Sequence, residues 1–413
     1  MRAHSTVTAG LVVATLMAVT TLLAQQPGGG RQGAQRPGPA PGPLPPDPPG
    51  TVGMPLAGLS ARETAAFMAG LEEFQHEETA GSGLGPIFND VSCVACHRAP
   101  AVGGTSNTTV TRFGLAANGA FDPLTSRGGS LLQRRAITPQ ALERVPPEAN
   151  VVAQRQSTPL FGLGLIEAIP DAAIEQNAEG QKPFGIRGRV SRVLDVATGQ
   201  MRVGRFGWKG QQATLLSFSA DAYLNEMGIT SRLFPTENAP NGNAALLAQF
   251  DAFADPEDEM DRVTGKGDID VVADFMRLLA PLPAQTQNRD ADAGEAVFSQ
   301  VGCAVCHRPA MVTGPSPVRA LEAQRVALYS DLLLHDMGEL GDGIAQGAAG
   351  PREFRTPPLW GVRASGPYLH DGRARTLDEA IQSHAGEATD VRARYRALTP
   401  TERDQLLRFL SGI

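Results

Sequence analysis

Two copies of one short pattern constrain this chain more than any other feature. They are Cys93-Val94-Ala95-Cys96-His97 and Cys303-Ala304-Val305-Cys306-His307. A Cys-x-x-Cys-His run is typical of covalent haem c attachment, in which the two thiols form thioethers and the His becomes the proximal iron ligand. The chain has 4 cysteines, and the two motifs contain all of them, so no thiol remains for a disulfide, a zinc site or a Cys nucleophile. The sequence therefore predicts two covalently attached haem c groups, with His97 and His307 as proximal ligands.

The N-terminal residues have the pattern of a secretory signal peptide, which we assign to residues 1–24. Arg2 gives a basic start, an apolar stretch runs from Val7 to Leu23, and the character then becomes polar. Thr and Gly residues interrupt a stretch that is already marginal for spanning a bilayer. We expect an exported protein of the periplasm without stable membrane insertion. The alternative is an uncleaved helix that tethers the chain to the inner membrane.

The rest of the chain divides by composition and length. Residues 25–53 are rich in Pro and Gly and are expected to form a disordered spacer, because they cannot bury enough apolar area to order. The remainder exceeds the usual size of one core, so we predict an N-terminal haem domain with insertions at 54–250, a linker and helix at 251–285, and a C-terminal haem domain at 286–413. A formal charge of −7 disfavours nucleic acid as a partner and leaves a small soluble electron carrier or a small molecule.

Local patterns predict a mainly α fold with a small β-hairpin insertion. Helices are indicated at four places: after the capping box Ser60 to Glu63, at 268–279, at 294–298 before the second motif, and after Thr399. Alternation between 187 and 206 predicts the hairpin, with its turn at Thr198-Gly199. The acidic run at 251–261 lacks the frame of a calcium loop and is interpreted as a solvated linker face.

The distal ligands decide whether an iron transfers electrons or meets a substrate. Beyond the signal peptide and the proximal ligands, the chain offers His76, His335, His370 and His384. His76 falls outside the apolar stripe of its helix and is expected to be solvated. His384 follows a predicted helix at 376–383 and suits the distal position of the second haem, with Met337 and Met311 as the alternatives. His335 and His370 each precede an Asp in a turn and are expected to bond a haem propionate or backbone, which leaves the first haem as the open, catalytic one.

Longer segments carry a resemblance to a known family. Residues 83–89 (GLGPIFN), 329–338 (YSDLLLHDMG), 355–361 (RTPPLWG) and 367–372 (PYLHDG) together resemble the bacterial di-haem oxidoreductase family, whose members are described as peroxidases. The resemblance spans nearly all of the chain after the spacer and extends distantly to the dihaem cytochrome c peroxidases. It implies two cytochrome c-like domains, with one haem storing an electron and the other meeting the oxidant. In those peroxidases a Met ligates the second haem at the position of His384, and an imidazole there should lower the haem's potential.

The resemblance also points to catalytic residues. Residues 156–167 resemble the loop that carries the proton-transferring Glu of the peroxidases, which implies Glu167 as general acid–base and Gln156 as a pocket hydrogen-bonder. The alternative for Glu167 is a structural role, capping a helix or pairing with an Arg such as Arg155. Trp208 and Trp360 are the 2 tryptophans of the chain and are candidates for an inter-haem relay, although packing against a haem edge is the commoner role.

Together these features predict a periplasmic dihaem oxidoreductase that reduces peroxide at the first haem and receives electrons at the second from a carrier protein. Two other functions remain open at this point. One is a pure electron-transfer cytochrome with both irons six-coordinate, and the other is a dihaem oxygenase that acts on an organic substrate.

Overall fold

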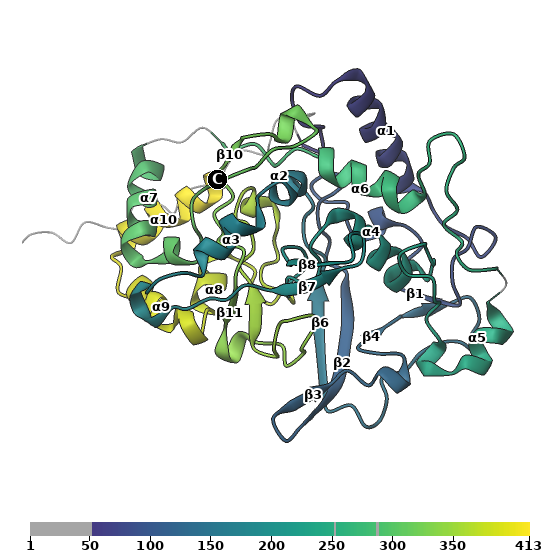
Figure 1. Cartoon of the computed structure of the whole chain (residues 1–413). Coiled ribbons are helices and arrows are strands. Elements are labelled where there is room, and N and C mark those ends of the chain that lie inside the picture. The colour runs from purple at the N-terminus through teal and green to yellow at the C-terminus, as the bar shows by residue number, and fades with distance from the viewer. Residues whose placement is uncertain (1–51, 252, 286–288) are drawn as a thin grey trace, which may run out of the picture. The chain divides into compact units, whose positions relative to one another are not determined.

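The structure, a computed structural model, describes residues 52–251, 253–285 and 289–413, and the predicted signal peptide and most of the spacer lie outside this range. More residues lie in helices than in strands, as expected for a mainly α chain (Figure 1). The helices are α1 (Ala61–Gln75), α2 (Leu163–Glu167), α3 (Asp171–Asn177), α4 (Leu215–Ala222), α5 (Ala244–Phe250), α6 (Asp268–Leu278), α7 (Arg289–Val301), α8 (Leu377–Gln382), α9 (Thr389–Arg396) and α10 (Pro400–Gly412). The strands are β1 (Ile87–Phe88), β2 (Thr109–Ala117), β3 (Ala120–Asp122), β4 (Leu131–Leu132), β5 (Arg135–Ala136), β6 (Val151–Gln156), β7 (Arg192–Asp195), β8 (Gln200–Val203), β9 (Met311–Val312), β10 (Arg325–Val326), β11 (Leu334–Asp336) and β12 (Glu353–Arg355). Of the helices in these ranges, none is both long and apolar enough to span a membrane.

The helix ends follow the capping signals of the sequence. At α1 the Ser60 hydroxyl accepts a hydrogen bond from the Glu63 amide at 3.3 Å, while the Glu63 carboxylate accepts from the Ser60 amide at 2.7 Å. This reciprocal pair satisfies two backbone donors that the first helical turn leaves open. Thr399 and Glu402 make the same box at α10. The predicted helices at both positions are therefore confirmed, and His76 lies exposed at the end of α1.

Two helix pairs build the apolar core. Helix α1 packs on α6, where the ring of Phe275 lies 5.3 Å from that of Phe67 and 4.8 Å from that of Phe74. Helix α7 packs on α10 around Phe298 and Phe409, whose ring centroids are 5.4 Å apart. The larger cluster of buried side chains takes in residues on both sides of the predicted linker at 251–285. The two-domain division stays a prediction.

A small antiparallel sheet was missed by the sequence analysis. Strand β2 pairs with β6 from Thr109↔Gln156 to Gly114↔Val151, and its other contacts are with β4 and β3. The predicted hairpin is confirmed as β7 and β8, which pair from Arg192↔Val203 to Asp195↔Gln200. The sheet matters for function because β6 ends at Gln156, the first residue of a segment that lines the cavity at the second motif.

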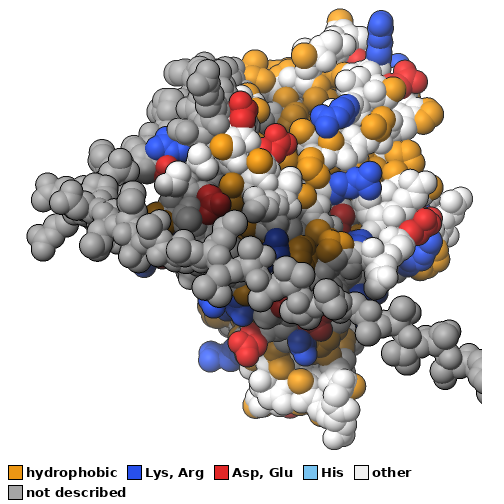
Figure 2. Space-filling model, turned by 90° about the vertical axis from the view of Figure 1, so that its left-hand side faces the viewer, with side chains coloured by type: hydrophobic (Ala, Val, Ile, Leu, Met, Phe, Trp, Pro, Cys, Tyr) orange, Lys and Arg blue, Asp and Glu red, His pale blue; other side chains and the backbone are white. Residues whose placement is uncertain are grey.

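Charged side chains are distributed without strong separation by sign. Figure 2 shows Lys and Arg interspersed with Asp and Glu over one face, with hydrophobic side chains between them. The acidic run at 251–261 is not the uniformly solvated face that we expected. Asp258 is only 4% exposed, and its carboxylate accepts a hydrogen bond from the Asp268 amide at 2.6 Å, at the start of α6. The reason is that the unpaired amides of a helix N-terminus attract a carboxylate even when it must be buried.

Candidate haem sites and cavity

The two Cys-x-x-Cys-His motifs have the same local geometry. Each begins with a short 3-10 turn, at Cys93–Ala95 and at Cys303–Val305. In each the proximal His directs Nδ1 to a backbone carbonyl 3.0 Å away, that of Gly104 for His97 and that of Tyr329 for His307. Such a contact fixes the ring and its tautomer, and it leaves Nε2 as the nitrogen that can bind a metal. The residues of both motifs therefore fit a haem c iron.

The thiols are poorly suited to any chemistry of their own. Burial raises the pKa of Cys93 and of Cys303 to about 12, and that of Cys96 to about 11. Reactive or metal-binding cysteines instead need a lowered pKa, because the thiolate is the nucleophile and the ligand. A thioredoxin-like pair or a zinc site is thus disfavoured, in agreement with the covalent attachment predicted from the motif.

A cavity of about 270 Å³ opens on the second motif. Its wall includes Cys303, Cys306 and His307, but none of the three corresponding residues of the first motif. Most of the remaining wall is apolar, which is usual for a cofactor or ligand site. Further lining residues are Phe161, Leu163, Phe206, Phe218, Phe298, Leu340, Phe354, Pro358, Leu359, Val362, Leu377, Ile381 and Leu410.

His384 faces His307 across this cavity. Their ring centroids are 6.5 Å apart, and the Nδ1 of His384 lies 2.8 Å from the Ala380 carbonyl at the end of α8, so its Nε2 is also free. An imidazole nitrogen binds a metal ion at about 2 Å, so two rings that share one ion hold their centres roughly 6 Å apart. Burial lowers the pKa of both imidazoles, to about 4 for His307, which favours the neutral form that binds metals. The spacing thus matches one iron held between the rings of His307 and His384. Met337, the alternative ligand, also lines the cavity.

The segment after β6 connects the cavity with the first motif. Gln156, Ser157, Thr158 and Pro159 line the cavity, and the Ser157 hydroxyl donates to the Cys96 carbonyl at 2.8 Å. The indole nitrogen of Trp208 donates to the Gln156 carbonyl at 2.8 Å. Ser157 was missed by the sequence analysis, because nothing in the local pattern shows which residue the loop will contact.

Trp360 lines the same cavity. A Cβ at Gly162 would lie 2.8 Å from Trp360 Cζ2, and one at Gly164 only 1.9 Å from the Arg277 carbonyl. Glycine is therefore required at both positions for α2 to approach Trp360 and α6. This accounts for the Gly-Leu-Gly sequence without any nucleotide-binding role.

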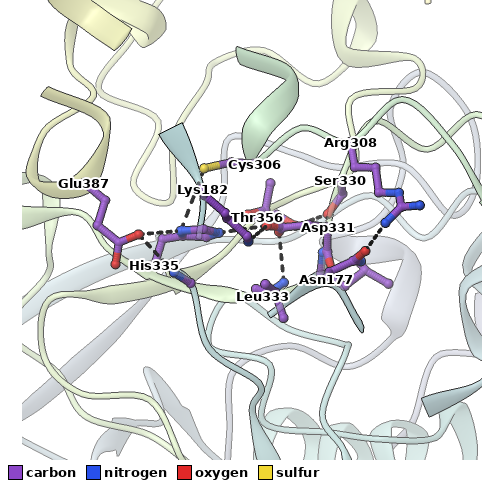
Figure 3. A network of polar contacts seen from close by, with 12 residues as sticks. Asn177, Lys182, Cys306, Arg308, Ser330, Asp331, Leu333, His335, Thr356 and Glu387 are labelled. Atoms are coloured by element: carbon purple, nitrogen blue, oxygen red, sulfur yellow. Dashed lines mark hydrogen bonds and ion pairs between the residues drawn. The ribbon is translucent and has the colours of Figure 1, made fainter. Parts of the chain in front are cut away.

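His335 is the centre of a buried polar network (Figure 3). Its Nε2 lies 3.0 Å from an oxygen of Asp331 and its Nδ1 2.8 Å from an oxygen of Glu387, with the Cys306 sulfur 3.8 Å away. Burial alone would lower the pKa of His335, but the bonds to Asp331, Cys306 and Glu387 outweigh it and raise the pKa to about 12. Both ring nitrogens thus contact carboxylates of the chain, and the expected bond of His335 to a haem propionate or backbone group stays a prediction.

The network extends to the rest of the second motif. The Asp331 amide donates to the Cys306 carbonyl at 2.8 Å, and the Asp331 carboxylate accepts from the Leu333 amide at 3.0 Å. Lys182 approaches the same carboxylate to 3.7 Å. Glu387 also lines the cavity, a role that the sequence did not indicate because its partner lies 52 residues away. The network therefore connects the turn of the second Cys-x-x-Cys-His motif to the loop that follows α8.

His370 is the other predicted propionate or backbone ligand. It is 4% exposed and lines the cavity, where its ring stacks on Phe354 at a centroid distance of 4.5 Å and meets Trp208 edge-on at 6.4 Å. Burial lowers the pKa of His370 to about 4. The side chain is thus a neutral ring within an aromatic wall, and its backbone carbonyl accepts from the Gln156 amide at 2.7 Å.

Glu167 lies at the end of α2 and is not among the residues that line the cavity. Its carboxylate accepts from Arg277 Nε of α6 at 2.6 Å and from the Leu215 amide at the start of α4 at 2.7 Å. These contacts are of the structural kind that we kept as the alternative, although the partner is Arg277 and not Arg155. Arg155 instead pairs with the buried Asp342 at 2.7 Å. The acid–base role of Glu167 stays a prediction, and this placement does not favour it.

Comparison with known proteins gives one family match. The sequence matches the family described as "Di-haem oxidoreductase, putative peroxidase" over residues 141–413, which include the second motif but not the first. No curated protein matches the chain.

Several solved structures are similar at low identity. They include the hydrazine synthase of Kuenenia stuttgartiensis under 20 bar of xenon, 15% identical with a TM-score of 0.38 over 97% of this chain and 100% of that one. A MauG-like protein associated with microbial copper homeostasis is 16% identical, with a TM-score of 0.39 over 89% and 94% of the two chains. The diheme peroxidase BthA of Burkholderia thailandensis is 14% identical, with a TM-score of 0.39 over 84% and 85%. With scores at this level, the family assignment depends on the sequence match alone.

Proposed function

Because this chain belongs to the di-haem oxidoreductase family, and is thereby an oxidoreductase, we propose that it reduces a peroxide with two covalently attached haem c groups. The first haem, on Cys93, Cys96 and His97, is the reaction site. The second, on Cys303, Cys306 and His307, is the electron-transfer site. We place the two haems in cytochrome c-like domains at 54–250 and 286–413.

The observation that carries this proposal is the opposition of His307 and His384 at 6.5 Å. Haem iron supplies one-electron transfer when both axial positions are filled, and reaction with peroxide when one is open. His307 and His384 would hold the iron of the second haem from both sides, each kept in orientation by a backbone carbonyl. A second haem held in this way would be closed to peroxide and suited to holding an electron.

The first site differs because no imidazole of the described residues is paired with His97 in this way. Phe74 is the ring that lies against His97, at 6.1 Å. His76 is 56% exposed at its side chain, both nitrogens of His335 contact carboxylates, and His370 stacks on Phe354. The asymmetry between the two sites supports an open first site.

The residues between the sites suggest how they communicate. Trp208 contacts His370, and its indole donates to the Gln156 carbonyl, next to Ser157, which donates to the Cys96 carbonyl. We propose that Trp208 serves the transfer of electrons between the sites, and that Trp360 packs against the second haem. Reduction of one hydrogen peroxide takes up two electrons and two protons and forms two water molecules. Gln156, whose amide donates to Thr105 Oγ1 at 3.3 Å, is the polar side chain that we propose orients the oxidant.

The location and partner follow from the chemistry of attachment. Covalent haem c is assembled on the export side of the membrane, which fits the signal-peptide pattern of residues 1–24. We therefore propose a periplasmic protein that receives electrons from a small soluble carrier.

The test is ferric electron paramagnetic resonance of the purified holoprotein, together with peroxide turnover using an artificial one-electron donor. We expect one low-spin component from the second site and one high-spin, cyanide-accessible component from the first. His384→Ala should convert the low-spin component into a second high-spin component, because the iron loses one axial ligand. The control His76→Ala should leave both components unchanged because His76 is exposed. Two low-spin components without peroxide turnover would instead identify an electron-transfer cytochrome. A low-spin component that survives His384→Ala would exclude His384 as the ligand.

A further inference from the structure

Three carboxylates that the haem sites do not use converge at one point of the chain. They belong to Glu237, Asp255 and Glu257, and one oxygen of each lies within 4.8 Å of the other two. Asp255 and Glu257 come from the acidic run at 251–261, while Glu237 comes from an earlier loop. Acidic residues often cluster on surfaces, so the geometry alone does not indicate a ligand.

Glu237 distinguishes this cluster from a surface group of acids. It is only 6% exposed, and while Oε1 accepts from the Asn238 amide at 2.6 Å, Oε2 is buried without a hydrogen-bond partner. Leaving a buried carboxylate oxygen without a partner is costly, because the oxygen loses its water and gains nothing in exchange. Burial, together with the charges of Glu257, Asp255 and Asp251, raises the pKa of Glu237 to about 8.

The donors nearby are too few for the negative charge. Thr230 Oγ1 lies 2.7 Å from an oxygen of Asp255 and also contacts Glu257, whose carboxylate accepts from the Thr230 amide at 2.8 Å. One hydroxyl carries a single proton and cannot donate to both carboxylates. No Lys or Arg in the part of the chain that the structure describes forms an ion pair with any of the three acids. A cation is the group that would satisfy all of them together.

We propose that Glu237, Asp255 and Glu257 bind a calcium ion. Calcium prefers six to eight oxygen ligands in a flexible arrangement, with carboxylates, carbonyls and water all suitable, whereas magnesium usually takes one or two carboxylates and keeps several waters. Three carboxylates on two loops match the first description. The ion would fasten the loop of Glu237 to the segment in which Asp258 accepts from the first amide of α6.

This site could not be found from the spacing of the acidic run. A calcium loop is recognised by ligands that alternate within one short segment. Here the third and most buried ligand precedes the run, so the pattern within residues 251–261 is incomplete by itself. The proposed calcium site is also independent of the peroxidase function, because none of its residues lines the haem cavity.

The test is calorimetric titration of the chelator-treated holoprotein with CaCl₂, and separately with MgCl₂. We expect the wild-type protein to bind one more equivalent of calcium than Glu237→Gln, with a dissociation constant of about 10⁻⁴–10⁻³ M, as in extracellular calcium modules. Comparing stoichiometries removes the contribution of any calcium bound elsewhere. Glu259→Gln is the matched control, because Glu259 is an exposed acid of the same run that lies outside the cluster. It should bind calcium as the wild type does.

A second variant keeps the test decisive if Glu237→Gln does not fold. Asp255 is exposed, so Asp255→Asn should fold normally and still lose at least tenfold in calcium affinity. The thermal unfolding midpoint should rise with CaCl₂ in the wild type and in Glu259→Gln, but not in the two cluster variants. Equal calcium binding by the wild type and both cluster variants would refute the site. Tighter binding of magnesium than of calcium would refute the choice of ion.

Discussion

The buried imidazole of His335 allows a quantitative test of how the second haem site is held together. We consider the substitution His335→Leu, which removes both ring nitrogens and leaves an apolar side chain among the polar partners of the network. Asp331 is 1% exposed and would keep only the Leu333 amide at 3.0 Å and the more distant Lys182 at 3.7 Å. Glu387 would lose its contact of 2.8 Å but would remain in partial contact with solvent.

The magnitude follows from the burial of Asp331. Removing one partner of a buried ion pair costs about 3–5 kcal/mol, because the remaining charge is left without compensation in a medium that solvates it poorly. The control is His76→Leu, since the His76 side chain is 56% exposed and lies 4.0 Å from Glu78. An exposed pair of that kind contributes about 0–1 kcal/mol. We therefore expect the two variants to differ by about 2–5 kcal/mol in free energy of unfolding.

The assay is urea unfolding of the holoprotein at equilibrium, followed by far-UV circular dichroism, with haem content checked by absorbance. A double variant, Asp331→Asn with His335→Leu, removes the uncompensated charge and should be less destabilised than the sum of its single variants, by about 0.5–3 kcal/mol. The reasoning would be refuted by a His335→Leu variant within about 1 kcal/mol of His76→Leu, or by simple additivity in the double variant.

Two further predictions concern buried charged side chains. The stabilisation from the His335 network should be largest between the ordinary pKa values of 4.5 for Glu387 and 6.5 for His335. The stabilisation should decline above pH 6.5, because the folded imidazole of His335 keeps its proton up to a pKa of about 12 while the unfolded imidazole loses it. It should also decline below pH 4.5, as the pH falls toward the folded pKa of Glu387 of about 2. Unfolding of wild type and His335→Leu at pH 3, 5.5 and 9 measures this, and a constant difference would contradict it. Arg205 is fully buried and donates to the Ile166 and Ile169 carbonyls, so Arg205→Met should cost about 1.5–3 kcal/mol in free energy of urea unfolding through the loss of these hydrogen bonds. The half-exposed Arg192, paired with Glu175, is the control, and Arg192→Met should cost about 1 kcal/mol or less, so equal losses would count against the argument.

Features with a local cause were predictable from the sequence. The capping boxes at Ser60 and Thr399, the hairpin turn at Thr198-Gly199 and the exposure of His76 each depend on residues within a few positions of one another. The attachment motifs belong to the same group, since the thiols and the proximal imidazole lie in one turn. The place of His384 just after a capped helix was also predictable, while its role as a distal ligand stays a prediction.

Features that depend on distant partners were not predictable. The sheet of β2 and β6 joins segments whose pairing no short pattern specifies, and Glu167 meets Arg277 from 110 residues away. The Glu167 side chain is 18% exposed, and partial burial alone does not tell a catalytic carboxylate from one that fastens two helices. Glu387 and Glu237 were missed for the same reason, because their importance arises only when loops distant in sequence are brought together.

The carbonyls that orient the two proximal imidazoles have a consequence for biogenesis. His97 takes its orienting oxygen from Gly104, 7 residues later, whereas His307 takes it from Tyr329, 22 residues later, and its opposing ring belongs to His384 beyond α8. In the exported protein that we propose, the imidazole of His97 can be oriented by the local backbone as soon as residue 104 has emerged. The imidazole of His307 reaches its final surroundings only after His384, near the end of the chain, has emerged. We therefore expect the C-terminal centre to mature last, and truncations near the end of the chain to yield a product with one completed centre.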